Sequence, residues 1–169
     1  MGYTHDTSMA QWVFAQEWKT SAGTWTSTLA SNVLSEVRTA AAAAFTGYIP
    51  IKIPSNSKVL KGSYLKSIDV YYKIGTAAAT DFATVELEKM IAPLDTVIPT
   101  GSAVTITQDA AHDTAAERKA VAEHKMTVTL TTPVWVDDDH YYVLEIIVDC
   151  AATTVFTFYG ARVNYTMRS

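Results

Sequence analysis

The chain has 169 residues, the usual size of one domain, of which 49% are hydrophobic and only 18% are charged. Its formal net charge is −4 and no run of basic residues occurs, which argues against a nucleic-acid partner. The single cysteine, Cys150, excludes an internal disulfide, and no apolar stretch is long enough for a membrane-spanning helix. Residues 1–12 lack the pattern of a secretory signal, so we expect folding in a cytoplasm and no membrane partner.

Two strands that carry tryptophans are predicted near the N-terminus, at residues 10–18 and 23–28. Their tryptophans are Trp12, Trp18 and Trp25. Because the segment is polar at first and then rich in tryptophan, we expect residues 1–18 to form an arm that contacts a neighbouring subunit. The remaining residues, 19–169, are expected to form a single sandwich domain.

Residues 33–44 could form either a helix or a strand. Five consecutive alanines at 40–44 favour a helix by intrinsic propensity. The alternation of side chains at residues 33–39 and the lack of a clear stop signal after it favour a strand that runs into Phe45. A strand is therefore our prediction. Residues 45–53 are predicted as the next strand.

Five further segments are predicted as strands because apolar and polar residues alternate along them with a period of two. These segments are residues 64–74, 82–91, 124–132, 141–150 and 153–166. Each is expected to bury one face in a core. Cys150 ends the fourth segment and is expected to be a small core residue.

Two aromatic features depart from simple alternation. Tyr71 lies on the polar side of its strand, which makes it a candidate for an exposed contact. The last strand has large apolar residues on both faces near Phe156 and Phe158. A strand that is apolar on both faces is covered on both sides, here by a loop or by a neighbouring subunit.

One short helix is predicted at residues 115–123, inside a long connection from about residue 107. Thr114 and Glu117 have the spacing of a capping box, in which each side chain accepts a hydrogen bond from the other's backbone amide. With about eight strands, the fold class is all-β: an antiparallel, jelly-roll-like β-sandwich with one short helix.

No pattern in the sequence indicates a catalytic, cofactor or metal site. His112, Asp113 and His124 lack the tight spacing of zinc ligands, so a polar loop is the favoured interpretation. The three aspartates at 137–139 beside His140 are favoured as a solvated turn rather than a calcium site, because adjacent strand residues point to alternating sides. Glu86, Glu88 and Glu145 lie on strand faces, as acids commonly do. We therefore expect that the protein is not an enzyme.

The aromatic residues suggest binding, and two interpretations remain open for them. A subunit interface is favoured over a sugar-stacking platform, because tryptophan and tyrosine are enriched at protein interfaces. The candidate interface residues are Trp12, Trp18, Trp25, Tyr71, Phe156 and Phe158.

Several stretches together resemble uncharacterised virion structural proteins of bacteriophages and environmental viruses. They are Gly23–Thr26, Arg38–Ala44 with Tyr48–Ile51, Leu65–Tyr72, Ala110–Arg118, His124–Pro133 and Phe158–Val163. The similarity covers most of the chain from Gly23 onward but includes no diagnostic motif and no catalytic residue.

This resemblance implies a decoration or cement protein, a minor capsid protein, or a part of a head fibre or tail. Its implied partners are copies of itself, with a trimer favoured, and other virion proteins such as the major capsid protein. The implied location is the virion, after assembly in the host cytoplasm. The alternative is a carbohydrate-binding module that holds host glycans.

Overall fold

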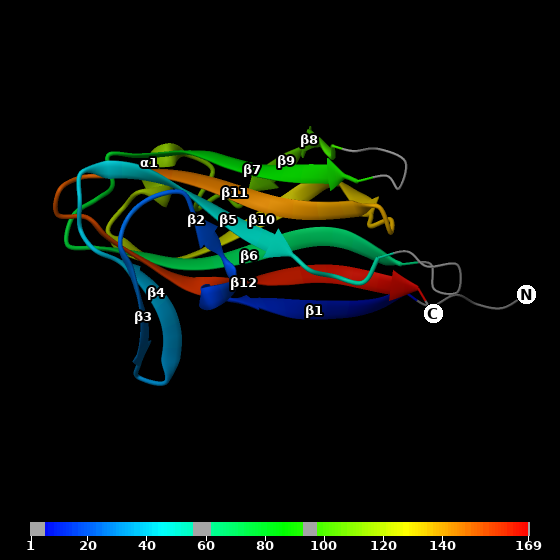
Figure 1. The fold of residues 1–169 in the computed structure, drawn as a ribbon, viewed down its shortest axis with the longest axis horizontal. Coiled ribbons are helices and arrows are strands. Elements are labelled where there is room, and N and C mark those ends of the chain that lie inside the picture. Colours follow the sequence, from blue (N-terminus) through cyan, green and yellow to red (C-terminus); the bar gives the residue numbers. More distant parts are fainter. Residues whose placement is uncertain (1–5, 56–61, 93–97, 169) are drawn as a thin grey trace, which may run out of the picture.

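A computed structural model of the protein describes residues 6–55, 62–92 and 98–168. Within these residues, two antiparallel sheets of seven and five strands pack face to face as a sandwich (Figure 1). The larger sheet contains β1 (Asp6–Phe14), β3 (Trp25–Ala30), β4 (Val33–Arg38), β6 (Ser63–Gly75), β9 (Ile106–Gln108), β10 (Ala122–Trp135) and β12 (Val155–Arg168). The smaller sheet contains β2 (Lys19–Thr20), β5 (Ala43–Ile51), β7 (Asp81–Ile91), β8 (Thr100–Val104) and β11 (His140–Cys150).

Eight of these strands are paired in the nested order of a jelly roll. Strand β4 pairs with β12, β5 with β11, β6 with β10, and β7 with β8, and every pair is antiparallel. The strand order is therefore β4-β12-β6-β10 in one sheet and β5-β11-β7-β8 in the other. This is a jelly roll, so the predicted fold class is confirmed.

The core lies between the two sheets, where the period-two patterns predicted it. Ile68, Val70, Tyr72 and Ile74 of β6 are fully buried, and so are Met126 and Val128 of β10. From the other sheet, β11 contributes Tyr142, Leu144, Ile146, Val148 and Cys150. The expectation that Cys150 is a core residue is confirmed.

Strand β12 is not apolar on two faces, which corrects the prediction made from its sequence. Its register with β6 shifts between Phe158 and Gly160, which is the mark of a β-bulge. The bulge reverses which residues face the core. Phe156 and Phe158 before it are therefore buried in the same core as Ala161, Val163 and Tyr165 after it. No neighbouring subunit is needed to cover them.

The N-terminal strand is part of the sandwich. Strand β1 pairs with β12 from Asp6 to Phe14, and a short 3-10 helix, η1 (Ala15–Glu17), follows it. Trp18 then enters the core between the sheets. The expected boundary at residue 18 between an arm and a sandwich is therefore not present among the described residues.

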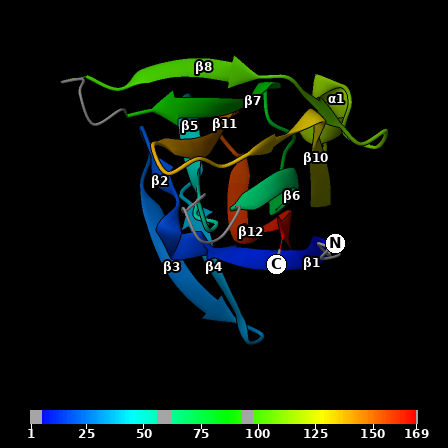
Figure 2. The same cartoon turned by 90° about the vertical axis from the view of Figure 1, so that its right-hand side faces the viewer.

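Strands β3 and β4 form a hairpin that projects from the sandwich (Figures 1 and 2). Its two-residue turn is Ser31–Asn32, and both residues have positive φ angles, 51° and 63°. This is the backbone of the tight hairpin turns that match strand twist, and asparagine tolerates it well. The strand predicted for residues 33–44 is correct as far as Arg38, but the chain then crosses to the other sheet before β5 begins.

The predicted helix is present but shorter. Helix α1 covers Ala115–Arg118, and β10 already begins at Ala122. The capping box is confirmed, because the Thr114 hydroxyl accepts from the Glu117 amide and the Glu117 carboxylate accepts from the Thr114 amide. No helix among the described residues has both the length and the apolar character needed to cross a membrane.

Candidate functional site

A groove of about 830 Å³ lies between the β3–β4 hairpin and the outer face of the larger sheet. Its floor comes from the sheet and consists of Trp12, Tyr71, Lys73, Glu123, Thr157 and Tyr159. Its wall comes from the hairpin and consists of Thr28, Ala30, Ser31, Val33, Ser35 and Val37. We refer to these twelve residues as the outer groove.

The base of the hairpin is anchored in the protein. Arg38 is buried, and its guanidinium donates to the backbone carbonyls of Ala41 and Ala43 while lying 5.4 Å from the centre of the Phe45 ring. Trp25, opposite Arg38 in the hairpin, packs against the same core. These contacts hold the hairpin wall in place beside the sheet.

Trp12 and Tyr71 form the aromatic part of the floor. Their ring centres are 5.4 Å apart and their planes are tilted by 34°. Trp12 comes from β1 and Tyr71 from β6, so the contact reaches across β12, which lies between these strands. Trp12 remains 50% exposed, so its ring is available to a ligand or partner.

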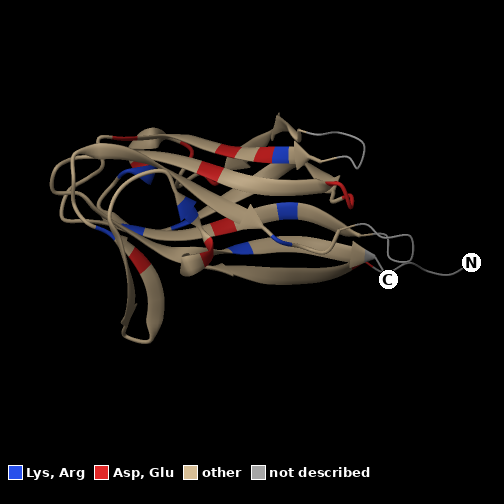
Figure 3. Cartoon of the chain, in the orientation of Figure 1, with Lys and Arg blue, Asp and Glu red and all other residues tan. Residues whose placement is uncertain are grey.

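The outer groove carries little charge. Its lining has one ion pair, in which Lys73 Nζ lies 3.0 Å from a Glu123 carboxylate oxygen. The hydrogen bond that Lys73 donates to Glu123 raises the pKa of Lys73, so the lysine keeps its proton. Figure 3 shows how few charged residues lie along β1 and the hairpin. The remaining lining is apolar or bears hydroxyl groups, which suits an uncharged ligand.

Large apolar side chains are exposed on β1 and on the hairpin. On β1 they are Met9, Trp12 and Phe14, and on the hairpin they are Leu29, Val33 and Leu34, with exposed fractions from 41% to 73%. Leu29 and Leu34 lie opposite each other in the hairpin. We refer to these six residues as the outer apolar surface.

Only two of the six predicted interface residues belong to this region, namely Trp12 and Tyr71. The predictions for Trp18, Phe156 and Phe158 are wrong, because all three are buried in the protein's own core. The Trp18 ring stacks on Phe158 with centres 4.1 Å apart, and it contacts Trp25 edge-on at 4.8 Å. Trp25 is mostly covered as well, so these four residues serve the core rather than an interface.

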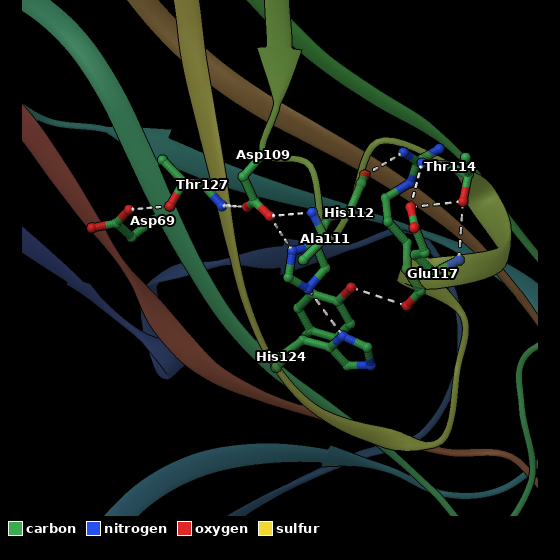
Figure 4. A network of polar contacts seen from close by, with 10 residues as sticks. Asp69, Asp109, Ala111, His112, Thr114, Glu117, His124 and Thr127 are labelled. Atoms are coloured by element: carbon green, nitrogen blue, oxygen red, sulfur yellow. Dashed lines mark hydrogen bonds and ion pairs between the residues drawn. The ribbon is translucent and has the colours of Figure 1, made fainter.

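A second polar site joins the long connection to the larger sheet (Figure 4). His112 Nδ1 lies 2.8 Å from Asp109 Oδ1, and His112 Nε2 lies 3.1 Å from Nδ1 of His124. His124 Nε2 in turn lies 2.9 Å from the carbonyl oxygen of Ala120. The two histidines were considered with Asp113 as metal ligands and a polar loop was favoured, and the carboxylate that lies beside His112 is Asp109. The four ring nitrogens each face a polar partner, as in a chain of hydrogen bonds.

The carboxylate of Asp109 also binds the sheet. Burial alone would raise the pKa of Asp109, but the hydrogen bond from the Thr127 amide and those from His112 and Ala111 outweigh burial and lower it. The hydroxyl of Thr127, on β10, donates to Asp69 on β6. Asp109 is thus linked to β6 through Thr127. Asp109 therefore stays ionised and acts as an anchor.

Asp137, Asp139 and His140 gather at the turn before β11. Their potential ligand atoms all lie within 4.8 Å of one another. His140 Nδ1 lies 3.3 Å from Asp137 and Nε2 lies 3.3 Å from Asp139. As predicted, the three adjacent aspartates do not converge, since Asp138 is exposed and outside the group. The two carboxylates face different ring nitrogens, so one histidine links them.

The acids named from the sequence meet on the smaller sheet. Glu145 of β11 lies directly opposite Glu86 of β7. Burial, followed by the nearby charges of Glu86 and Glu88, raises the pKa of Glu145. The Cys150 thiol also has a raised pKa because it is buried, which keeps it protonated and a poor nucleophile.

Sequence reasoning missed the hairpin wall and Tyr159. The signal for the hairpin was available, since Ser31–Asn32 is a turn dipeptide between two short alternating segments. The prediction ended the first of these strands at Thr28 and so missed the turn. Tyr159 was not singled out because it lies at the β-bulge of β12, which leaves no mark in the residue types.

Comparisons with known proteins place the chain in no family. No protein-family model matches the chain, and no curated protein matches it. A solved structure of a carbohydrate-binding module from the β-sandwich superfamily is similar, with a TM-score of 0.40 and 13% sequence identity. The alignment covers 95% of this chain and 56% of that one, so the chain spans little more than half of its structural neighbour.

Proposed function

We propose that this protein is a structural component of a virus particle, which associates with copies of itself and docks on the particle. The observation that carries this proposal is the outer apolar surface, with Leu29 at 73% and Phe14 at 60% exposure. Exposed apolar side chains of this size commonly mark contacts with other chains. The absence of any sequence run suited to nucleic acid directs the proposal toward a protein partner.

The chemistry of the surface favours association by apolar burial. With one ion pair in the outer groove, charge contributes little, and removal of apolar surface from water supplies on the order of 25 cal/mol per Å² before the costs of association. We therefore expect self-association that depends only weakly on salt. A closed cyclic oligomer is the default symmetry, and the two-fold dimer is its commonest form.

The viral part of the proposal rests on the sequence resemblance and on compatibility of the fold. Jelly rolls occur in viral capsid domains, but they also occur in lectins, so the fold alone does not choose a function. Docking partners would be other virion proteins, such as the major capsid protein, and the site of action would be the virion. Assembly would take place in the host cytoplasm.

Sedimentation velocity over a range of protein concentrations tests the self-association. We expect a species heavier than the 18.4 kDa chain. The double variant Trp12→Ser/Leu29→Ser should weaken it, whereas Val121→Ser, which removes an exposed apolar side chain outside the outer apolar surface, should not. A strict monomer at every concentration would overturn the proposal.

Carbohydrate binding is a second candidate, favoured by the aromatic floor of the outer groove. Trp12, Tyr71 and Tyr159 lie there with the hydroxyl groups of Thr28, Ser35 and Thr157, which could stack on and hydrogen bond to a sugar. The 34° tilt between Trp12 and Tyr71 favours a curved or short ligand over a flat chain.

A glycan array tests this second candidate. Binding should disappear in Trp12→Ala and Tyr71→Ala and persist in Tyr141→Ala, which alters an exposed ring on the smaller sheet. An array without signal for the wild-type protein would count against sugar binding.

A further inference from the structure

Strand β1 is an edge strand along its whole length. It pairs with β12 from Asp6 to Phe14, and no other described strand lies on its outer side (Figures 1 and 2). The other strands that end a sheet are shorter, with two residues in β2, six in β3, five in β8 and three in β9. With nine residues, β1 is the longest open edge in the described part of the chain.

This edge lacks the usual protection against pairing with another strand. Natural proteins guard long edges with lysine, proline, bulges or inward-pointing charges. The sequence of β1 contains neither lysine nor proline, and its one charged residue is Asp6 at the first position. Its pairing with β12 runs from Asp6 to Phe14 without a register shift. The edge is therefore regular and nearly uncharged.

The direction of the peptide groups can be deduced from Phe14. Its amide donates to Glu17 Oε2 at 2.8 Å, so it is not used in pairing with β12. In an antiparallel pair, successive residues direct their N–H and C=O groups alternately toward and away from the partner strand. The peptide groups of Ser8, Ala10 and Trp12 therefore point outward, where a further strand could bind them.

We infer that two copies of this protein pair through β1, antiparallel, around a two-fold axis at Ala10. This inference rests on the proposed self-association and names its partner surface, which is the same edge of a second copy. The two Ala10 residues would lie opposite each other, and Ser8 of each copy would lie opposite Trp12 of the other. Each of these pairs would exchange two backbone hydrogen bonds, which joins the two larger sheets into one.

The side chains suit this register. Ala10 at the axis is small, so the strands can approach without a clash between copies. Trp12 would lie beside Ser8, another small residue, and would be covered over part of its exposed ring. Since an isologous contact requires one patch to complement itself, the placement of small residues opposite the large one supports the two-fold arrangement.

Charge variants at the axis test the pairing in the full-length protein. Ala10→Lys places two like charges opposite each other, and we expect the dimer dissociation constant to rise about tenfold or more. Ala10→Glu should do the same, whereas an equal mixture of the two variants should dimerise again. Ala103→Lys is the matched control, because Ala103 is an exposed alanine on the edge strand β8. Circular dichroism confirms that each variant folds.

The outcomes separate this inference from the proposed function. Loss of the dimer in both single variants, with recovery in the mixture, would support pairing through β1. If the wild-type protein forms a trimer, or if Ala10→Lys dimerises as the wild type does, the pairing is wrong while self-association stands. A wild-type monomer would overturn both the pairing through β1 and the proposed self-association. The edge would then be open to a strand of a different protein.

Discussion

His112 and His124 meet through their ring nitrogens, with Nε2 of His112 lying 3.1 Å from Nδ1 of His124. The Ala120 carbonyl near His124 Nε2 can only accept a hydrogen bond, so neutral His124 carries its proton on Nε2. The contact between His112 Nε2 and His124 Nδ1 holds one proton. Burial first, and then the charge of His112, lower the pKa of His124, although the bond to Ala120 acts in the opposite direction.

The lowered pKa of His124 predicts a loss of stability toward acid. In the unfolded chain this histidine regains its ordinary pKa of 6.5, so below that pH the unfolded state binds more protons than the folded state. The contribution of His124 is complete above pH 6.5 and is lost as the pH falls toward the lowered folded value. Urea unfolding at about pH 7.5 and 5.5 should show a smaller difference in His124→Gln than in the wild type. Lys125→Gln, which alters the exposed neighbour of His124, should keep the wild-type difference. If the difference between the two pH values is as large in His124→Gln as in the wild type, His124 is not the group responsible.

Arg118 is predicted to hold the long connection against β7. Its buried guanidinium donates to the carbonyls of Phe82, Ala83 and His112 at 2.9, 3.1 and 2.8 Å. Arg118→Met fills similar volume but leaves these carbonyls without their donor, and it should lower the free energy of unfolding by about 2–4 kcal/mol. Arg162→Met, which changes an exposed arginine on β12, should alter it by less than about 0.5 kcal/mol. Equal effects in urea unfolding would show that the buried contacts of Arg118 contribute nothing.

The parts of the fold that sequence could predict are those encoded in neighbouring residues. The alternation from Ile68 to Ile74 places every second side chain in the core, because strand geometry has a period of two. The capping box at Thr114 and Glu117 was predictable for the same reason, since its partners are three residues apart. Such local rules located most strands and the helix start.

The candidate site was less predictable because it depends on contacts between distant residues. The β-bulge at Gly160 reverses the buried face of β12, and residue types alone gave no sign of it. Trp12 and Trp18 looked alike in the sequence, yet one lies on the outer groove and the other in the core. Asp109 reaches His112 only because the connection turns back on the sheet. Each of these outcomes depends on contacts between residues distant in the sequence, which local residue patterns do not reveal.

The bulge in β12 predicts a strict requirement for glycine at residue 160. Gly160 has a φ of +130°, and a Cβ added to it would lie 2.7 Å from the carbonyl oxygen of Val13. Gly160→Ala should therefore strain the backbone and push β1 outward, lowering the free energy of unfolding by about 1–3 kcal/mol. Gly75→Ala is the control, because its Cβ would meet the nearest atom, a Val155 oxygen, at 3.9 Å. Equal unfolding midpoints for the two variants would disprove the close approach of β1.

Substitutions of the two N-terminal tryptophans are predicted to have different effects, one on the stability of the core and the other on association. Trp18 lies against Phe158 and over Gly47, where an added Cβ would come within 2.6 Å of its ring, so Trp18→Ala leaves a cavity that the neighbours cannot fill. We expect it to lower the free energy of unfolding by about 3–5 kcal/mol. Trp12→Ala removes a half-exposed ring and should lower it by less than about 1 kcal/mol, while weakening self-association in sedimentation velocity. If both variants lost similar stability, Trp12 would belong to the core, and the outer groove would lose the aromatic residue on which its proposed binding depends.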